Sequence, residues 1–118
     1  MAQRSADCVF CGIVAGTIPS AQVRETDRTL AFRDVSPQAP VHVLVVPKDH
    51  YADVAEVVAA APHLLRLLLE ECVAVARDEG IADDGYRIAL NTGEQGGQAV
   101  AHCHAHVLGG RQMAGQLG

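Results

Sequence analysis

Histidine recurs at every second position in one short segment, at His102, His104 and His106. In a β-strand, side chains at alternate positions point to the same face, about 6.5 Å apart. We therefore predict a strand that presents three imidazoles on one face. Such a face is unusual for a core, because each ring carries a donor and an acceptor that need partners. The intervening residues would face the core: Cys103, Ala105 and Val107.

Two kinds of chemistry suit a row of imidazoles, and the spacing alone does not choose between them. Three histidines are a ligand set for zinc in proteins. Alternatively, one neutral imidazole acts as a nucleophile once its neighbours orient it. A solvated row of rings with no chemical role is the third possibility.

Length and charge limit the classes of protein that this chain can belong to. The 118 residues are enough for one domain, spanning 1–118, with residues 1–6 expected to be disordered and 114–118 to form a tail. The net charge of −5 argues against a nucleic-acid partner, which needs a basic surface. A small anion bound by backbone amides remains compatible with that charge.

We expect neither a targeting signal for export from the cytoplasm nor a membrane partner. Its first residues lack the apolar run of a secretion signal, and no segment has the roughly 18 apolar residues of a membrane span. We therefore expect a cytoplasmic protein whose four cysteines are thiols or metal ligands.

Cys8 and Cys11 form a CxxC pair near the start of the chain. Such a pair is half of a zinc site, but redox-active pairs share the same spacing. A zinc site needs two further ligands, and the candidates are the remaining histidines of the chain: His42, His50, His63 and the alternating three.

Hydrophobic periodicity predicts strands at 23–26, 29–34, 41–46 and 86–91, besides the histidine strand. The run at 41–46 is almost continuously apolar, so we expect it to be central and buried. His42 interrupts that run; a buried histidine is more often a hydrogen-bonded core residue than a ligand. Helices are expected at 13–15, at 53–61 and from Pro62 to Gly80.

The longest of these helices has an apolar arc wider than one sheet face can bury. The surplus suggests a symmetric dimer, and the alternative is burial within the same chain. The loop at 91–98 is rich in glycine and leads into the histidine segment. Its backbone amides either bind a phosphate or simply form a turn.

The alternating histidines, followed by apolar residues, resemble the signature of the histidine triad (HIT) superfamily. Further segments resemble its Hint branch of nucleoside phosphoramidate hydrolases, in the same order along the chain. The likeness extends from Cys8 to Met113, and the CxxC pair resembles that of bacterial-type members. The matching segments are 34–42, 46–48, 85–87, 96–98 and 108–113.

The resemblance implies a role for individual residues. His104 resembles the nucleophile that attacks the α-phosphorus, His42 its supporting partner, and His106 the contact to phosphate oxygens or the leaving group. His102 is the remaining triad member, and Asp34 resembles the ribose-binding carboxylate. The residues that resemble the base pocket are Val9, Phe10, Ile13, Phe32, Val35 and Leu44. Those that resemble the phosphate-binding loop are Asn91, Gly97, Gln98 and Ala99.

The resemblance also implies a structural zinc, held by Cys8, Cys11, His50 and His102, with no catalytic metal. A redox-active CxxC pair is the alternative.

The fold class that the resemblance implies is α+β. It has about five mainly antiparallel strands and two helices, paired into a homodimer with a continuous sheet. The implied function is hydrolysis of purine nucleoside 5′-phosphoramidates, or of related nucleotidyl conjugates, through a nucleotidyl-His104 intermediate. The alternatives are a dinucleoside polyphosphate hydrolase of the same superfamily and a nucleotide-binding scaffold with incidental activity.

Overall fold

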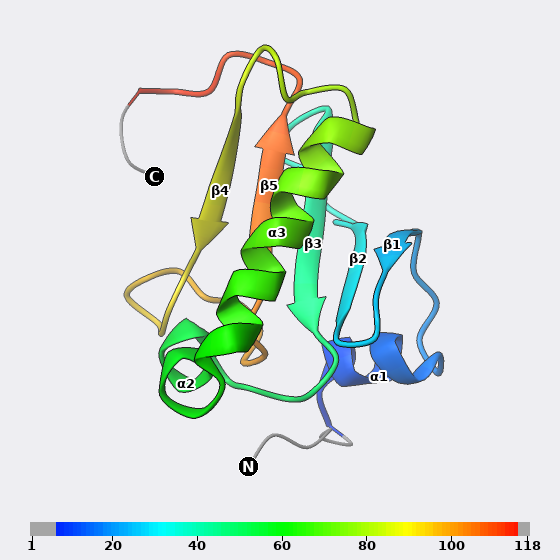
Figure 1. Cartoon of the computed structure of the whole chain (residues 1–118), viewed down its shortest axis with the longest axis vertical. Coiled ribbons are helices and arrows are strands. Elements are labelled where there is room, and N and C mark those ends of the chain that lie inside the picture. The colour runs from blue at the N-terminus through cyan, green and yellow to red at the C-terminus, as the bar shows by residue number, and fades with distance from the viewer. Residues whose placement is uncertain (1–6, 116–118) are drawn as a thin grey trace.

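The computed structural model describes residues 7–115, so the disorder expected for 1–6 and the last part of the expected tail lie outside the described residues. Within this range the chain forms five strands and three helices around one sheet (Figure 1). Their order is α1 (Val9–Ala15), β1 (Gln22–Glu25), β2 (Thr29–Arg33), β3 (Val41–Pro47), α2 (Val54–Ala60), α3 (Pro62–Asp78), β4 (Tyr86–Leu90) and β5 (Ala105–Gly109).

The architecture confirms the α+β class, with the three helices that the local patterns predict and one more than the family resemblance implies. The first helix begins earlier than the predicted 13–15, at Val9. The Cys8 sulfur accepts the N–H of Cys11 and caps that start, and Gly16 ends the helix with a φ of 83°, which glycine adopts without strain.

The sheet is antiparallel throughout, in the order β1-β2-β3-β5-β4. The predicted central strand, β3, lies in the middle and is buried from His42 to Pro47. One face of the sheet is covered by α3, which crosses β3 and β5 (Figure 1). On the opposite face, α1 packs Phe10 and Ile13 against alternate residues of β2 and β3.

The histidine segment is less regular than the predicted strand. Pairing of β5 with β3 begins only at Ala105, so His102 and His104 lie in the connection before the strand. The chain leaves the sheet there because the N–H of Cys103 bonds to the carbonyl of Tyr51 at 2.6 Å instead of to β3. The prediction of a buried opposite face is nevertheless confirmed. Its residues are at most 1% exposed: Cys103, Ala105 and Val107.

Proline at its first position begins α3, as predicted, and Gly80 follows its end with a φ of 76°. Leu68 lies fully buried on the face toward the sheet, whereas Leu69 and Val73 remain 37% and 40% exposed. The apolar arc is therefore wider than the sheet covers. Within residues 7–115, no helix has the length and apolar character needed to cross a membrane.

Replacing Leu68 by alanine should lower the free energy of unfolding by about 3 kcal/mol, because it opens a cavity between α3 and the sheet. The matched control is Val58→Ala on α2, where the side chain is 50% exposed and the loss should stay below about 1 kcal/mol. Urea titration measures both variants. Equal losses would show that the core is not organised around this face of α3.

Candidate functional site

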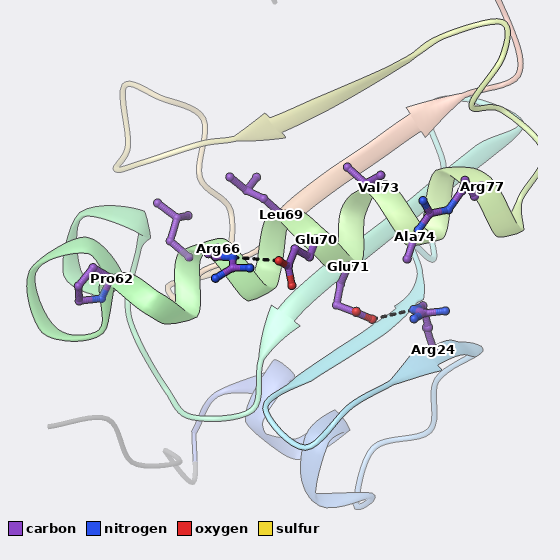
Figure 2. A pocket seen from close by; sticks show the side chains of 10 residues that line it. Arg24, Pro62, Arg66, Leu69, Glu70, Glu71, Val73, Ala74 and Arg77 are labelled. Atoms are coloured by element: carbon purple, nitrogen blue, oxygen red, sulfur yellow. Dashed lines mark hydrogen bonds and ion pairs between the residues drawn. The ribbon is translucent and has the colours of Figure 1, made fainter.

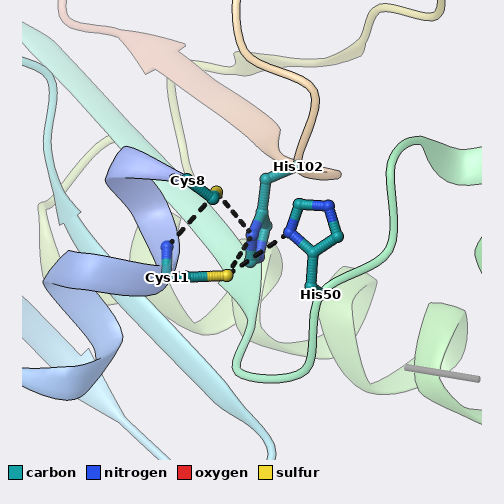
Figure 3. A group of neighbouring side chains, drawn as sticks. All are labelled: Cys8, Cys11, His50 and His102. Carbon is teal, nitrogen blue, oxygen red and sulfur yellow. Dashed lines mark hydrogen bonds between the residues drawn. The ribbon is translucent and has the colours of Figure 1, made fainter. Parts of the chain in front are cut away.

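Two cysteines and two histidines from three distant parts of the chain meet beside the start of α1 (Figure 3). The Cys8 sulfur lies 3.3 Å from Nδ1 of His102, and the Cys11 sulfur lies 3.3 Å from Nδ1 of His50 and 3.5 Å from Nδ1 of His102. Around a tetrahedral zinc with usual bond lengths, sulfur and nitrogen ligands are about 3.5 Å apart. The four ligand atoms therefore have the spacing of a Cys2His2 zinc site.

The protonation of His102 also suits a metal ligand. Its Nε2 lies 2.8 Å from the carbonyl oxygen of Pro47, which can only accept, so Nε2 carries the proton and Nδ1 is left with a lone pair. A metal-binding histidine is typically held in this way by its second nitrogen. Burial lowers the pKa of His102 to about 4, which keeps the ring neutral at pH 7.

A second cluster joins the other triad residues to β3. Nε2 of His42 lies 2.9 Å from Nδ1 of His106 and 3.4 Å from a carboxylate oxygen of Asp34. The backbone N–H of Gln38 donates to Nδ1 of His42 at 3.0 Å, so the proton of the neutral His42 ring is on Nε2. That proton is donated to His106, whose own proton is therefore on Nε2.

This second cluster does not suit a metal ion. A metal-bound histidine donates its other N–H to an acceptor, whereas Nδ1 of His42 faces the N–H donor of Gln38. A metal on Nε2 of His42 would leave that ring with no proton at all. The three-histidine metal site considered from the sequence does not form either, because His102 turns toward the cysteines.

In their neutral forms, His104 and His106 are opposite tautomers. Its Nδ1 lies 2.8 Å from the carbonyl oxygen of His102 and therefore donates, which leaves the lone pair on Nε2. The rings of His104 and His106 are neighbours, with centroids 5.0 Å apart. One imidazole thus has an unprotonated Nε2 and the next has an Nε2–H, an arrangement that suits a nucleophile beside a hydrogen-bond donor.

Burial is the main reason that His42 and His106 stay neutral. It lowers the pKa of both rings, and burial together with the neighbouring histidines brings the pKa of His106 to about 4. The Asp34 carboxylate acts in the opposite direction on both rings. At pH 7, His42 and His106 are therefore two neutral rings joined by a hydrogen bond.

His104 and His106 border a cavity of about 380 Å³ between α1 and the sheet, and Asp34 and Ala99 border it too. The six residues predicted as a base pocket all line this cavity, as listed here: Val9, Phe10, Ile13, Phe32, Val35 and Leu44. Sequence reasoning missed five further lining residues: Ile18, Pro19, Ser20, Arg33 and Val100. No local pattern marks them: Arg33 ends β2, and the other four reach the cavity only through the path of the loops before β1 and β5.

The glycine-rich loop uses several of its own donors internally. The N–H groups of Gly97 and Gln98 bond to carbonyls of Glu94 and Gly93, and the Gln98 side chain bonds to Gly93, Ala52 and Val100. Of the predicted phosphate-binding residues, only Ala99 lines the cavity. In the described part of the chain, the N–H of Ala99 has no acceptor. Gly97 and Gln98 therefore hold the loop, and Asn91 lies apart from the cavity lining.

Comparison with known proteins identifies the class that this fold and site define. The HIT domain family matches residues 15–113, and the chain belongs to that family. It is 41% identical over 111 residues to the purine nucleoside phosphoramidase of Escherichia coli K12, covering 94% of this chain and 93% of the relative. It is 45% identical over 109 residues to a 14 kDa zinc-binding protein of Brassica juncea, covering 91% and 96%.

A solved structure agrees with the fold. The crystal structure of a HIT family hydrolase from Legionella pneumophila Philadelphia 1 superposes with a TM-score of 0.89 at 44% identity, covering 92% of this chain and 97% of the other. The family resemblance drawn from the motifs is thereby confirmed.

Metal analysis of the purified protein should find about one zinc per chain, and Cys8→Ser should lose it, because one of four ligands is removed. The melting temperature should fall with the metal. Cys72→Ala is the matched control, since this thiol is buried in the core away from the cluster, and it should keep its zinc. A wild-type protein without zinc, prepared without chelators, would contradict the site.

Stability should depend on pH through His106. Its pKa is about 4 in the folded chain and about 6.5 when unfolded, so between these values the unfolded state binds more protons. The free energy of unfolding should therefore fall as the pH falls from 6.5 toward 4. The substitution His106→Asn removes the group that titrates.

The measurement is the difference in unfolding free energy between wild type and His106→Asn, from urea titrations at pH 4.5 to 8. Contributions of other groups largely cancel in the difference. The wild-type value minus the variant value should be constant above pH 7 and should decrease as the pH is lowered. A difference that stays constant over the whole range would refute the lowered pKa of His106.

Proposed function

We propose that the protein is a hydrolase of purine nucleoside 5′-phosphoramidates, or of related nucleotidyl conjugates, acting through a covalent intermediate on His104. This proposal is carried by the hydrogen bonds that assign opposite tautomers to His104 and His106, two rings that line one apolar cavity. The 41% identity to a purine nucleoside phosphoramidase supports the substrate class.

In the proposed reaction, the lone pair on Nε2 of His104 attacks the α-phosphorus and the bond from phosphorus to the leaving nitrogen breaks. The Nε2–H of His106 donates to the phosphate oxygens or the leaving nitrogen and stabilises the charge that develops there. Water then displaces the imidazole and releases the nucleoside monophosphate. Overall, water supplies the hydroxyl on phosphorus and the hydrogen on the departing amine.

The remaining lining residues bind the nucleotide. The rings of Phe10 and Phe32, with centroids 5.5 Å apart, belong to the apolar wall that takes the base. Asp34 accepts the ribose hydroxyls, and the N–H of Ala99 donates to a phosphate oxygen. Binding in this order along the cavity brings the α-phosphorus to His104.

We also infer that the Cys8, Cys11, His50 and His102 cluster holds a structural zinc. The ligand spacing, the protonation of His102 and the zinc-binding relative support it. The metal supplies no reacting group in this proposal. Its ligands fasten α1, and with it one wall of the cavity, to the segment that carries His104.

A homodimer is the proposed assembly, and its interface is the outward face of α3. A groove of about 800 Å³ runs along this face, where Leu69 and Val73 are exposed and the charged side chains of Arg24 and Glu71 are paired at 2.7 Å (Figure 2). The outer edge of β4 has no partner strand among the described residues, so a second copy can continue the sheet there.

His104→Ala should abolish hydrolysis of adenosine 5′-phosphoramidate, because the ring is a reactant in the proposed reaction. Folding and affinity for adenosine monophosphate should change little. A chromatographic assay with the phosphoramidate and a diadenosine polyphosphate, run in parallel, also separates the two substrate classes. Full hydrolysis by the variant would contradict the covalent mechanism. A nucleotidyl adduct trapped on His106 would show that His106, and not His104, is the nucleophile.

Val73→Glu should convert the dimer to a monomer, because it puts a charge in the middle of the apolar surface of α3. Light scattering after size-exclusion chromatography measures the mass. Val58→Glu is the matched control, since it adds the same charge at an exposed valine of α2 and should leave the dimer intact. A wild-type protein that is monomeric at micromolar concentration would contradict the assembly.

A further inference from the structure

The hydroxyl of Ser20 is buried and, within the part of the chain that the structure describes, has no hydrogen-bond partner. Ser20 lies in the loop between α1 and β1, and less than 1 Å² of its oxygen is accessible. A buried hydroxyl without a partner destabilises a protein, because it has lost water and gained nothing in exchange. Such groups are uncommon, and a ligand that satisfies the hydroxyl is one physical explanation.

Ser20 lines the same cavity as His104 and Asp34. Each of the other polar side chains of the lining already has at least one partner within the protein. Arg33 pairs with Glu79 through two contacts of 2.6 and 3.2 Å. One carboxylate oxygen of Asp34 accepts the N–H of Ser36, and the other lies beside His42. His104 and His106 belong to the histidine network described above.

We propose that Ser20 recognises the edge of the bound base. Its hydroxyl hydrogen-bonds to a nitrogen or exocyclic group of the purine; this inference rests on the proposed nucleotide substrate. Apolar walls bind the faces of any purine ring and distinguish poorly between rings that differ only in their polar substituents. A hydroxyl both donates and accepts, so it pairs with an amino group or a ring nitrogen.

From its buried position, the hydroxyl must turn toward the cavity to meet a bound base. Rotation about the Cα–Cβ bond of Ser20 carries its oxygen from one staggered position to the next, with no change of backbone. In the buried position seen here the hydroxyl has no partner among the described residues, and in this proposal the bound base supplies one. Ser20 therefore destabilises the empty site and stabilises the occupied one.

These opposite effects define the test. Calorimetric titration measures the affinity of the full-length, zinc-loaded protein for four monophosphates that differ only in the base: adenosine, inosine, guanosine and purine riboside. In Ser20→Ala, the affinity for the tightest ligand should fall about three- to tenfold, and the four affinities should converge. The melting temperature without nucleotide should rise, because the unpaired hydroxyl is gone.

Ser36→Ala is the control for the same truncation at an exposed serine outside the cavity lining, and it should leave the ratios of the four affinities unchanged. A Ser20→Ala variant with wild-type ratios, or with a lower melting temperature, would overturn the assignment of Ser20 alone. A wild-type protein that binds none of the four nucleotides would overturn the proposed function, and this inference with it.

Discussion

The hydrogen bond from Nδ1 of His104 to the carbonyl oxygen of His102, 2.8 Å long, decides which nitrogen of His104 is available for chemistry. That carbonyl is fixed because the His102 ring is fully buried and held on both sides, by the carbonyl of Pro47 and by the two cysteines. One residue thus belongs to both centres. Its side chain completes the cysteine cluster, and its main chain orients the neighbouring imidazole.

The same cluster determines the shape of the cavity. Cys8 and Cys11 lie at the start of α1, and the residue between them that faces inward, Phe10, contacts Phe32 and the ring of His104 edge-on. A shift of α1 would therefore move an aromatic wall and the surroundings of the nucleophile together. These contacts hold on the sheet a helix of only seven residues, which would be too short to be stable alone.

Local patterns in the sequence were sufficient for the strands, the long helix and the central position of β3, because these depend on periodicity and on caps. These patterns failed where contacts between residues distant in the sequence determine the local structure. The backbone hydrogen bond from the N–H of Cys103 to the carbonyl of Tyr51 takes His102 and His104 out of the sheet. The spacing of residues in the sequence does not reveal this hydrogen bond. The cysteine cluster joins residues 94 positions apart, so only the family resemblance grouped its ligands, and nothing in the sequence marked Ser20.

The neutrality of the histidine pair has a consequence for the release of the product. His42 and His106 are uncharged at pH 7, and the cationic side chain on the cavity wall, Arg33, is already neutralised by Glu79. In the proposed reaction, a singly charged phosphoramidate gives a monophosphate with nearly two negative charges. No lysine or arginine in the described lining is free to hold the second charge, and Asp34 repels it. Electrostatics thus favours the substrate over the product in the cavity and helps the product to leave.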